Sequence, residues 1–91
     1  MESEKLPSLE TIKRLPPREA IPLLDEMIQR NSSDDEIYVV RGMKYWSLNA
    51  HKQAMEDYLS ALCINPSSRA KTLLEFANSV LGYYNKDLLN P

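Results

Sequence analysis

His51 and Cys63 are the side chains of this sequence best suited to nucleophilic or metal chemistry, and each residue type occurs once. Both fall in one predicted helix, where twelve positions separate them by about 18 Å at about 1.5 Å per residue. A nucleophile and its base must lie within hydrogen-bond reach, so the two residues predict no catalytic dyad. No second histidine, cysteine pair or acidic cluster at ligand spacing accompanies them, and we expect no metal site.

The remaining reactive residue types also fail to form a recognised set. Gly42 and Gly82 are 40 positions apart, which excludes a phosphate-binding glycine loop. The acidic run Asp34-Asp35-Glu36 is interpreted as the cap and solvated start of a helix. Because an enzyme needs a nucleophile, a base or a metal set, we expect a protein without catalytic residues or a cofactor. The alternative is an accessory or regulatory subunit of an enzyme complex, with catalysis on its partner.

Composition and charge further restrict the functional classes to which this protein can belong. The chain has 91 residues, enough for one small domain, and a net charge of -2 with interspersed acidic and basic residues. A nucleic-acid binder would show a basic stripe, so we expect no nucleic-acid partner. Neither a signal peptide nor a run of 18 apolar residues is visible, and the sequence predicts a cytoplasmic protein with no membrane partner. Cys63, in the apolar stretch 61–64, is interpreted as a small buried hydrophobe.

Hydrophobic periodicity predicts an all-α fold. Tyr38, Gly42 and Tyr45 share one face of a helix over 35–48, which Asp34 or Asp35 can cap and which Asn49 can end in a left-handed conformation. A second helix over 51–64 carries an apolar side and a polar side, and Pro66 prevents its continuation. The polar side comprises Gln53, Glu56, Asp57 and Ser60.

Helices are also predicted on both sides of this pair. Ser67 or Ser68 can cap a largely apolar helix over 69–84. Upstream, Pro17 suits the first turn of a helix over 17–30, and a short helix is expected over 8–15. The helix spacing also indicates an internal repeat, because Ala54, Tyr58 and Ala61 recur 34 residues earlier as Ala20, Leu24 and Met27.

Seven spaced positions then carry a resemblance to a known family. The chain resembles a tetratricopeptide repeat, whose pattern sets aromatic, small, alanine and proline residues at fixed spacings. The matching positions, in the order aromatic, small, aromatic, alanine, aromatic, alanine and proline, are Tyr38, Gly42, Tyr45, Ala54, Tyr58, Ala61 and Pro66. The resemblance implies a right-handed superhelix of antiparallel helix pairs. It divides the chain into a degenerate repeat over 8–33, a clear repeat over 35–68, a capping helix over 69–84 and a tail over 85–91. For the capping helix, a shift of one residue matches best and places Leu73, Phe76, Ala77 and Val80 on the repeat pattern.

The resemblance also implies an inner groove lined by the first helix of each repeat. It assigns partner contacts to positions on two helices, Val39, Met43, Trp46, Leu74, Asn78 and Leu81. Met43 stands where family members that clamp a terminal carboxylate carry asparagine, so an apolar groove is expected instead. The helix over 35–48 therefore has two apolar faces, and an antiparallel pair buries only one of them. The chain's own ends, a second copy, or a bound peptide or helix could cover the other. We expect a protein-binding or assembly module with a protein, peptide or homodimer partner.

Overall fold

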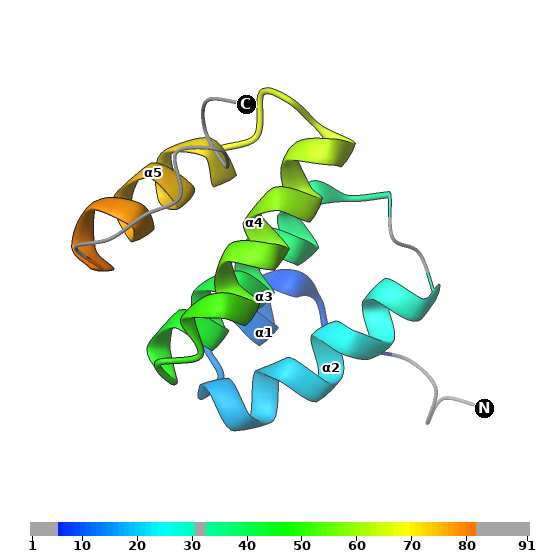
Figure 1. Cartoon of the computed structure of the whole chain (residues 1–91). Helices are drawn as coiled ribbons and strands as arrows, with labels where there is room; N and C mark the ends of the chain where they lie inside the picture. Colours follow the sequence, from blue (N-terminus) through cyan, green and yellow to red (C-terminus); the bar gives the residue numbers. More distant parts are fainter. Residues whose placement is uncertain (1–5, 31–32, 82–91) are drawn as a thin grey trace.

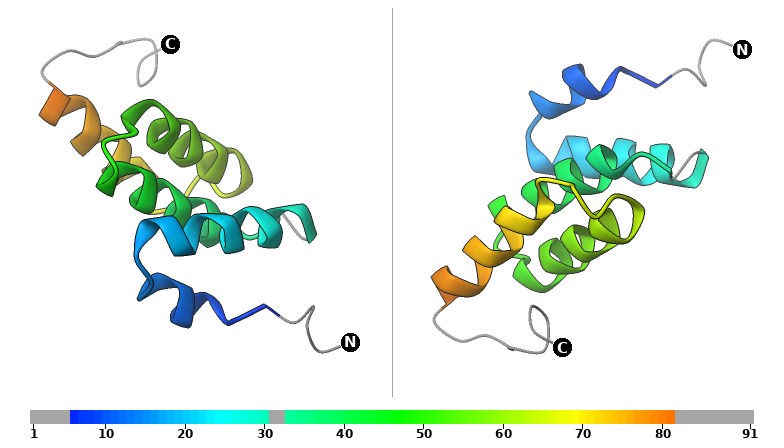
Figure 2. Two further views of the ribbon diagram at one scale, coloured as in Figure 1. Left: turned by 90° about the horizontal axis from the view of Figure 1, so that it is seen from below. Right: turned by 90° about the horizontal axis from the view of Figure 1, so that it is seen from above.

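The computed structural model describes residues 6–30 and 33–81 and shows five helices in these segments, without strands (Figure 1). They are α1 (Leu9–Lys13), α2 (Pro17–Arg30), α3 (Asp35–Ser47), α4 (His51–Ile64) and α5 (Ala70–Leu81). Helices that follow one another in sequence pack together (Figure 2). The all-α prediction and the five predicted helices are thus confirmed over the described residues. Positions 82–84 of the last predicted helix, and the predicted tail over 85–91, lie outside them.

Local hydrogen bonds explain where the helices begin and end. Asp34 caps α3, because its carboxylate accepts a hydrogen bond of 3.0 Å from the backbone N–H of Glu36. Asn49 adopts a φ of 63° in the turn between α3 and α4, as its place after a helix predicted. Before α5, the Ser68 hydroxyl accepts from the backbone N–H of Ala70 at 3.1 Å. The turn at Asn49 is short, so α3 and α4 run antiparallel (Figure 1).

A close helix crossing lies between α3 and α4. A Cβ atom at Gly42 would lie 2.6 Å from Cε1 of Tyr58 and 3.1 Å from the carbonyl oxygen of Ala54. The Tyr58 ring therefore occupies the space that any larger residue at position 42 would need. The small-residue positions predicted from the repeat pattern, Gly42 and Ala54, are confirmed as the place where these two helices approach.

Two apolar cores lie on different sides of α3. The first joins α3, α4 and α5, and its buried members are Val39, Ala54, Met55, Tyr58, Ala61, Ala70, Leu74 and Ala77. The second joins α1 and α2 to α3, through Ile12, Ala20, Leu24, Ile37 and Val40. Because α3 contributes to both cores, it is the central helix of the stack.

The rotation of α5 about its axis differs from the prediction. The resemblance placed Leu74 and Asn78 toward an open groove, but both are buried. Leu74 belongs to the same core as Ala61 of α4, and the small residues Ala70 and Ala77 beside it let the two helices pack closely. The exposed apolar side chains of α5 are instead Phe76 and Val80, one turn apart.

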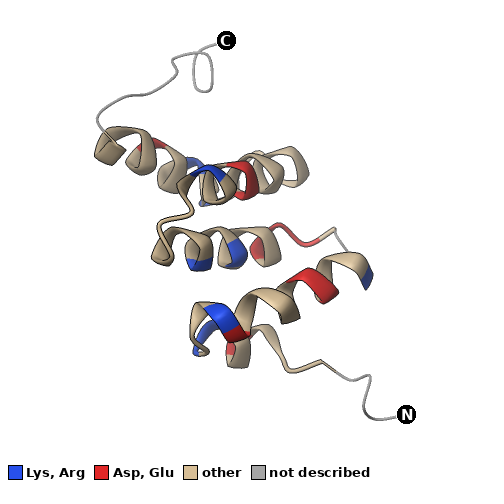
Figure 3. Cartoon of the chain, turned by 60° about the horizontal axis from the view of Figure 1, so that its bottom comes forward, with Lys and Arg blue, Asp and Glu red and all other residues tan. Residues whose placement is uncertain are grey.

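The described part of the chain contains no helix that is both long and apolar enough to cross a membrane. Acidic and basic residues are interspersed along the stack (Figure 3).

Candidate partner-binding groove

Met43 and Ser47 form an exposed strip on α3 between the two cores. Their neighbours Val39 and Val40 are buried, one in each core, whereas 40% of Met43 is exposed. This strip borders two concavities, of about 250 Å³ and about 210 Å³, and Met43 and Ser47 line both of them. The two concavities are thus adjacent, on either side of these shared residues, and we call the two together the α3 groove.

The smaller concavity is the apolar end of the α3 groove. Besides Met43 and Ser47 it is lined by Trp46, Tyr58, Leu73, Phe76 and Ala77. The Trp46 ring stands between two other rings, with its centroid 4.2 Å from that of His51 and 6.4 Å from that of Phe76. Phe76 remains 58% exposed despite this contact. An exposed aromatic beside a second aromatic and a methionine has the composition of an interface core.

The larger concavity is the basic end of the α3 groove. Its lining adds Lys13 from α1, Val40 and Lys44 from α3, and Arg69 from the start of α5. Three cations thus meet at one end of a groove in a chain whose net charge is -2. This end offers positive charge to an occupant, while the other end offers apolar surface.

Each of the three cations is held by a specific contact. The Lys44 ammonium donates to the carbonyl oxygens of Lys13 and Leu15, at 2.7 and 2.8 Å. The Lys13 carbonyl is the last of α1, where helical C=O groups lack intrahelical partners, and Leu15 lies two residues beyond the helix. Lys44 therefore fastens α1 to α3, and no carboxylate among the described residues forms an ion pair with it.

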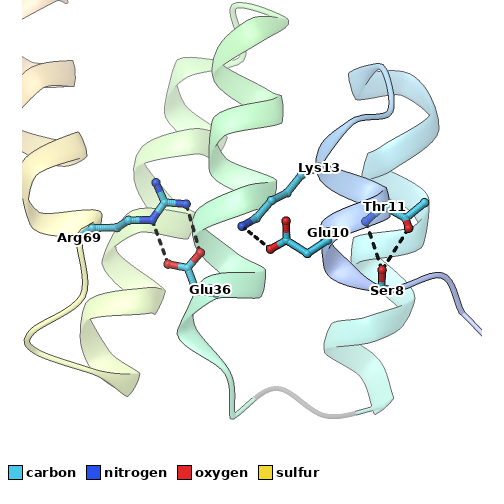
Figure 4. Close-up of polar contacts among 6 residues, drawn as sticks. All are labelled: Ser8, Glu10, Thr11, Lys13, Glu36 and Arg69. Atoms are coloured by element: carbon cyan, nitrogen blue, oxygen red, sulfur yellow. Dashed lines mark hydrogen bonds and ion pairs between the residues drawn. The ribbon is translucent and has the colours of Figure 1, made fainter.

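The other two cations form ion pairs (Figure 4). Lys13 lies 3.2 Å from Glu10, one turn earlier on α1. Arg69 donates two hydrogen bonds to the Glu36 carboxylate, at 2.9 and 3.1 Å, and so ties the start of α5 to the start of α3. Hydrogen bonding to Glu36 raises the pKa of Arg69 above its ordinary value, which keeps the guanidinium charged. Both pairs are partly exposed, so an incoming carboxylate can compete for them.

The structure brings together only part of the predicted site. Met43 and Trp46 line the α3 groove. Val39, Leu74 and Asn78 are buried within the chain, and their placement on an open face was wrong. Leu81, the last residue of α5, is half-buried beside the first core and lines neither concavity. The error on α5 comes from the helix register, since residues 74, 78 and 81 face inward when Phe76 faces out.

Sequence reasoning missed the basic end of the groove. Lys13, Lys44 and Arg69 come from three separate helical regions, and no pattern along the chain predicts that they meet. A signal for Phe76 did exist, because Leu73, Phe76 and Val80 recur at helical spacing. The repeat pattern assigned that stripe to the inside of a helix pair, whereas Phe76 and Val80 are exposed.

The residues that first suggested chemistry do not converge. His51 packs against Trp46, and Cys63 is exposed, so its interpretation as a buried hydrophobe was wrong. Cys63 lies in the last turn of α4, on the side of the helix that faces away from both cores. Among residues 6–30 and 33–81, no three His, Cys, Asp or Glu side chains are grouped so that they could hold a metal ion.

A partly buried ion network occupies another face of α3. Asp57, predicted on the solvent side of α4, is buried and accepts two hydrogen bonds from Arg41, at 2.9 and 2.7 Å. A third nitrogen of Arg41 donates to Asp25 of α2 at 2.8 Å, while the guanidinium carbon lies 5.7 and 5.8 Å from the centroids of the Tyr38 and Tyr45 rings. The network therefore joins three helices.

The network's pKa shifts point to a structural role. Hydrogen bonding to Asp57 raises the pKa of Arg41 above its ordinary value, and burial raises the pKa of Asp57. The second shift alone would favour a neutral carboxyl. The hydrogen-bond geometry shows that Asp57 is ionised, because both of its carboxylate oxygens accept short hydrogen bonds from the Arg41 guanidinium, which stays protonated.

Comparisons with protein families, with curated proteins and with solved structures found no match. The resemblance to a tetratricopeptide repeat therefore depends on the sequence positions that carry it.

Proposed function

We propose that this chain is a non-catalytic binding module that holds a peptide or helix of another protein in the α3 groove. The carrying observation is that the two concavities border the same residues, Met43 and Ser47, so that exposed apolar surface lies next to a cluster of cations. Exposed methionine and aromatic side chains favour protein contacts. The cations favour a partner segment with acidic residues near its apolar ones.

The proposed architecture is a short tetratricopeptide-like superhelix in which α1, α3 and α5 line the inner side. Two observations support it: Gly42 packs against Tyr58 and Ala54 as the pattern requires, and apart from Tyr58 of α4 the groove is lined by residues from these three helices or their flanks. Residues 8–33 and 35–68 would be its two repeats, and α5 its terminal helix.

Selection from a library of random peptides tests the function without a preselected ligand. We expect the purified chain to enrich related sequences, and Met43→Glu to weaken their binding at least about tenfold by placing a carboxylate in the groove floor. Ile64→Glu is the matched control, because Ile64 is 37% exposed and lines neither concavity. Both variants should retain the helical circular dichroism of the parent. Failure to enrich any sequence whose binding depends on Met43 would contradict the proposal.

A further inference from the structure

Helices α3 and α5 lie side by side and have α4 as a common neighbour. Glu36 at the start of α3 is paired with Arg69 just before α5, and the Trp46 and Phe76 rings meet further along the two helices. The two helices therefore run in the same direction. α4 packs against both of them and covers one side of the pair.

The α3 groove lies on the side of this pair that faces away from α4. Gly42 faces α4, where it contacts the Tyr58 ring, and Ser47 is about 140° around α3 from it at about 100° per residue. Each helix presents to the groove a row of side chains three and four positions apart. The rows are Val40, Met43 and Ser47 on α3, and Arg69, Leu73 and Phe76 along α5 and just before it. A third helix packs its own ridges between rows of this spacing.

The groove offers few hydrogen-bond partners to a peptide backbone. Among the described lining residues of the apolar concavity, only Ser47, Trp46 and Tyr58 carry polar side-chain atoms, and Tyr58 is 3% exposed. The Ser47 hydroxyl already donates to the Met43 carbonyl at 3.1 Å. An extended peptide would turn backbone N–H and C=O groups toward this surface, where they lose water without gaining partners. A helix pairs its own backbone groups and needs only side-chain contacts.

Lys44 is the cation of the groove without an ionic partner. Lys13 and Arg69 are each paired with a carboxylate. An ammonium group carries three N–H donors, and Lys44 uses two of them on carbonyl oxygens. The described residues supply neither a carboxylate nor a partner for the third donor. One acidic side chain of an occupant would therefore complete this end of the groove.

We infer that the α3 groove takes an amphipathic helix of another protein, laid along α3 with its apolar face on Met43 and one acidic side chain at Lys44. This inference rests on the proposed binding function and specifies the form of the partner. The length of the α3 row, from Val40 to Ser47, is about 10 Å at about 1.5 Å per residue, so two turns of a helix span it.

A second copy of this chain does not supply such a helix from its described residues. Its large exposed apolar side chains outside the groove are Leu48 beyond the end of α3, Ile64 at the end of α4 and Val80 on α5. Each stands on a different element, so none forms an apolar row with a carboxylate beside it. Charge complementarity at Lys44 and this lack of a row favour a different protein as the occupant.

Two libraries of peptides of about 18 residues test the form of the partner on the full chain. In the first library apolar positions follow the helical period, and in the second the same residues alternate along the chain. We expect binders that depend on Met43 from the first library and none from the second. Equally tight binders from the alternating library would overturn the inference and leave the binding function standing, whereas no binder from either would contradict the binding function itself.

A selected peptide then reports its own conformation. Proline at a central position of its polar face should weaken binding roughly a hundredfold, because proline breaks a helix there. Alanine at the same position is the control and should change affinity little. The helical circular dichroism of the mixture should exceed the sum of its components. Unchanged affinity of the proline peptide would overturn the inference.

Replacing the acidic residue of that peptide by its amide tests the position at Lys44. Glu→Gln in the peptide should weaken binding to the parent protein roughly fivefold, and equal affinities would overturn the predicted contact. On Lys44→Gln the two peptides should bind equally, because the comparison isolates the pair. Lys71→Gln is the control, since Lys71 is exposed and lines neither concavity, and it should retain the fivefold difference.

Two further measurements distinguish the other possible occupants. Replacing both Leu88 and Leu89 by Ala should not change the affinity for the selected peptide, whereas a tenfold gain would assign the groove to the chain's own C-terminal segment. Sedimentation of the chain alone should show a monomer. A dimer that Met43→Glu dissociates would assign the groove to a second copy and overturn the inference.

Discussion

Asn78 is a polar residue in an apolar setting. It is 4% exposed, and within the described part of the chain neither its amide nitrogen nor its amide oxygen has a hydrogen-bond partner. A buried polar group left unpaired costs about 1–3 kcal/mol. The last turns of α5 are therefore held less firmly than the buried residues Leu74 and Ala77 alone would hold them.

Replacing Asn78 with Leu should stabilise the protein by about 1 kcal/mol, because it removes the unpaired amide and adds apolar surface. For a domain of this size, that corresponds to a rise in melting temperature of about 4–8 °C. Ser79→Leu, at the exposed neighbouring position, is the control and should leave the melting temperature nearly unchanged. A lower melting temperature for Asn78→Leu would show that the amide is satisfied in solution.

At the scale of helices, Arg41 connects α3 to both of its neighbours. Its contact with α4 is the stronger one, with two hydrogen bonds to a carboxylate that is 5% exposed. Its contact with α2 is a single hydrogen bond to Asp25, whose side chain is 45% exposed. Removing one partner of a buried pair strands the other charge, whereas exposed pairs contribute little.

Asp57→Ala should therefore lower the free energy of unfolding by about 2–3 kcal/mol, and Asp25→Ala by about 0.5 kcal/mol. Chemical denaturation of the two variants beside the parent measures both values. Equal losses would mean that Arg41 binds its two aspartates with equal strength in solution.

The helices could be predicted from the sequence because their signals are local. Asp34 before α3, Asn49 after it and Pro66 after α4 each act within one turn, and the observed bounds follow them closely. The contacts of Arg41 could not be predicted, since Asp25 and Asp57 each lie 16 residues away along the chain. Asp57 in particular follows the polar side of α4, and only a cation on the facing helix explains its burial.

The groove was predictable only in part for a related reason. Met43 and Trp46 belong to α3, whose register the seven repeat positions determine. On α5 the apolar residues surround much of the helix, so periodicity does not select which side is buried. The packing of Ala70 and Leu74 on α4 makes that selection, and it needs the neighbouring helix.

At the scale of the whole molecule, the chain is a stack in which each helix depends on its neighbours. The extents of 47 × 24 × 17 Å describe an elongated body rather than a sphere. In such a stack the end elements have neighbours on one side only, so their local stability is lower. α3 contributes to both cores, whereas α1 and α5 each contribute to one.

Hydrogen exchange in the native state should therefore protect the backbone amides of α3 and α4 most strongly and those of α1 and the last turns of α5 least. This difference in protection between the helices should remain after each amide's exchange rate is corrected for its intrinsic, unfolded-chain rate. A uniform protection across all five helices would mean that the stack opens only as one unit, and it would contradict this ranking.

The guanidinium of Arg41 also helps to determine how far α4 is offset along α3 when the chain folds. Sliding α4 by one turn along α3 would move Asp57 by about 5.4 Å and leave a charged group without its partner in a crowded interface. The contact of the Tyr58 ring with Gly42 opposes the same slide by shape, so charge and shape select one offset together. A chain with Met at position 41 and Leu at position 57 loses only the selection by charge, so it should keep much of its stability and, through the Tyr58 contact, a single set of amide resonances.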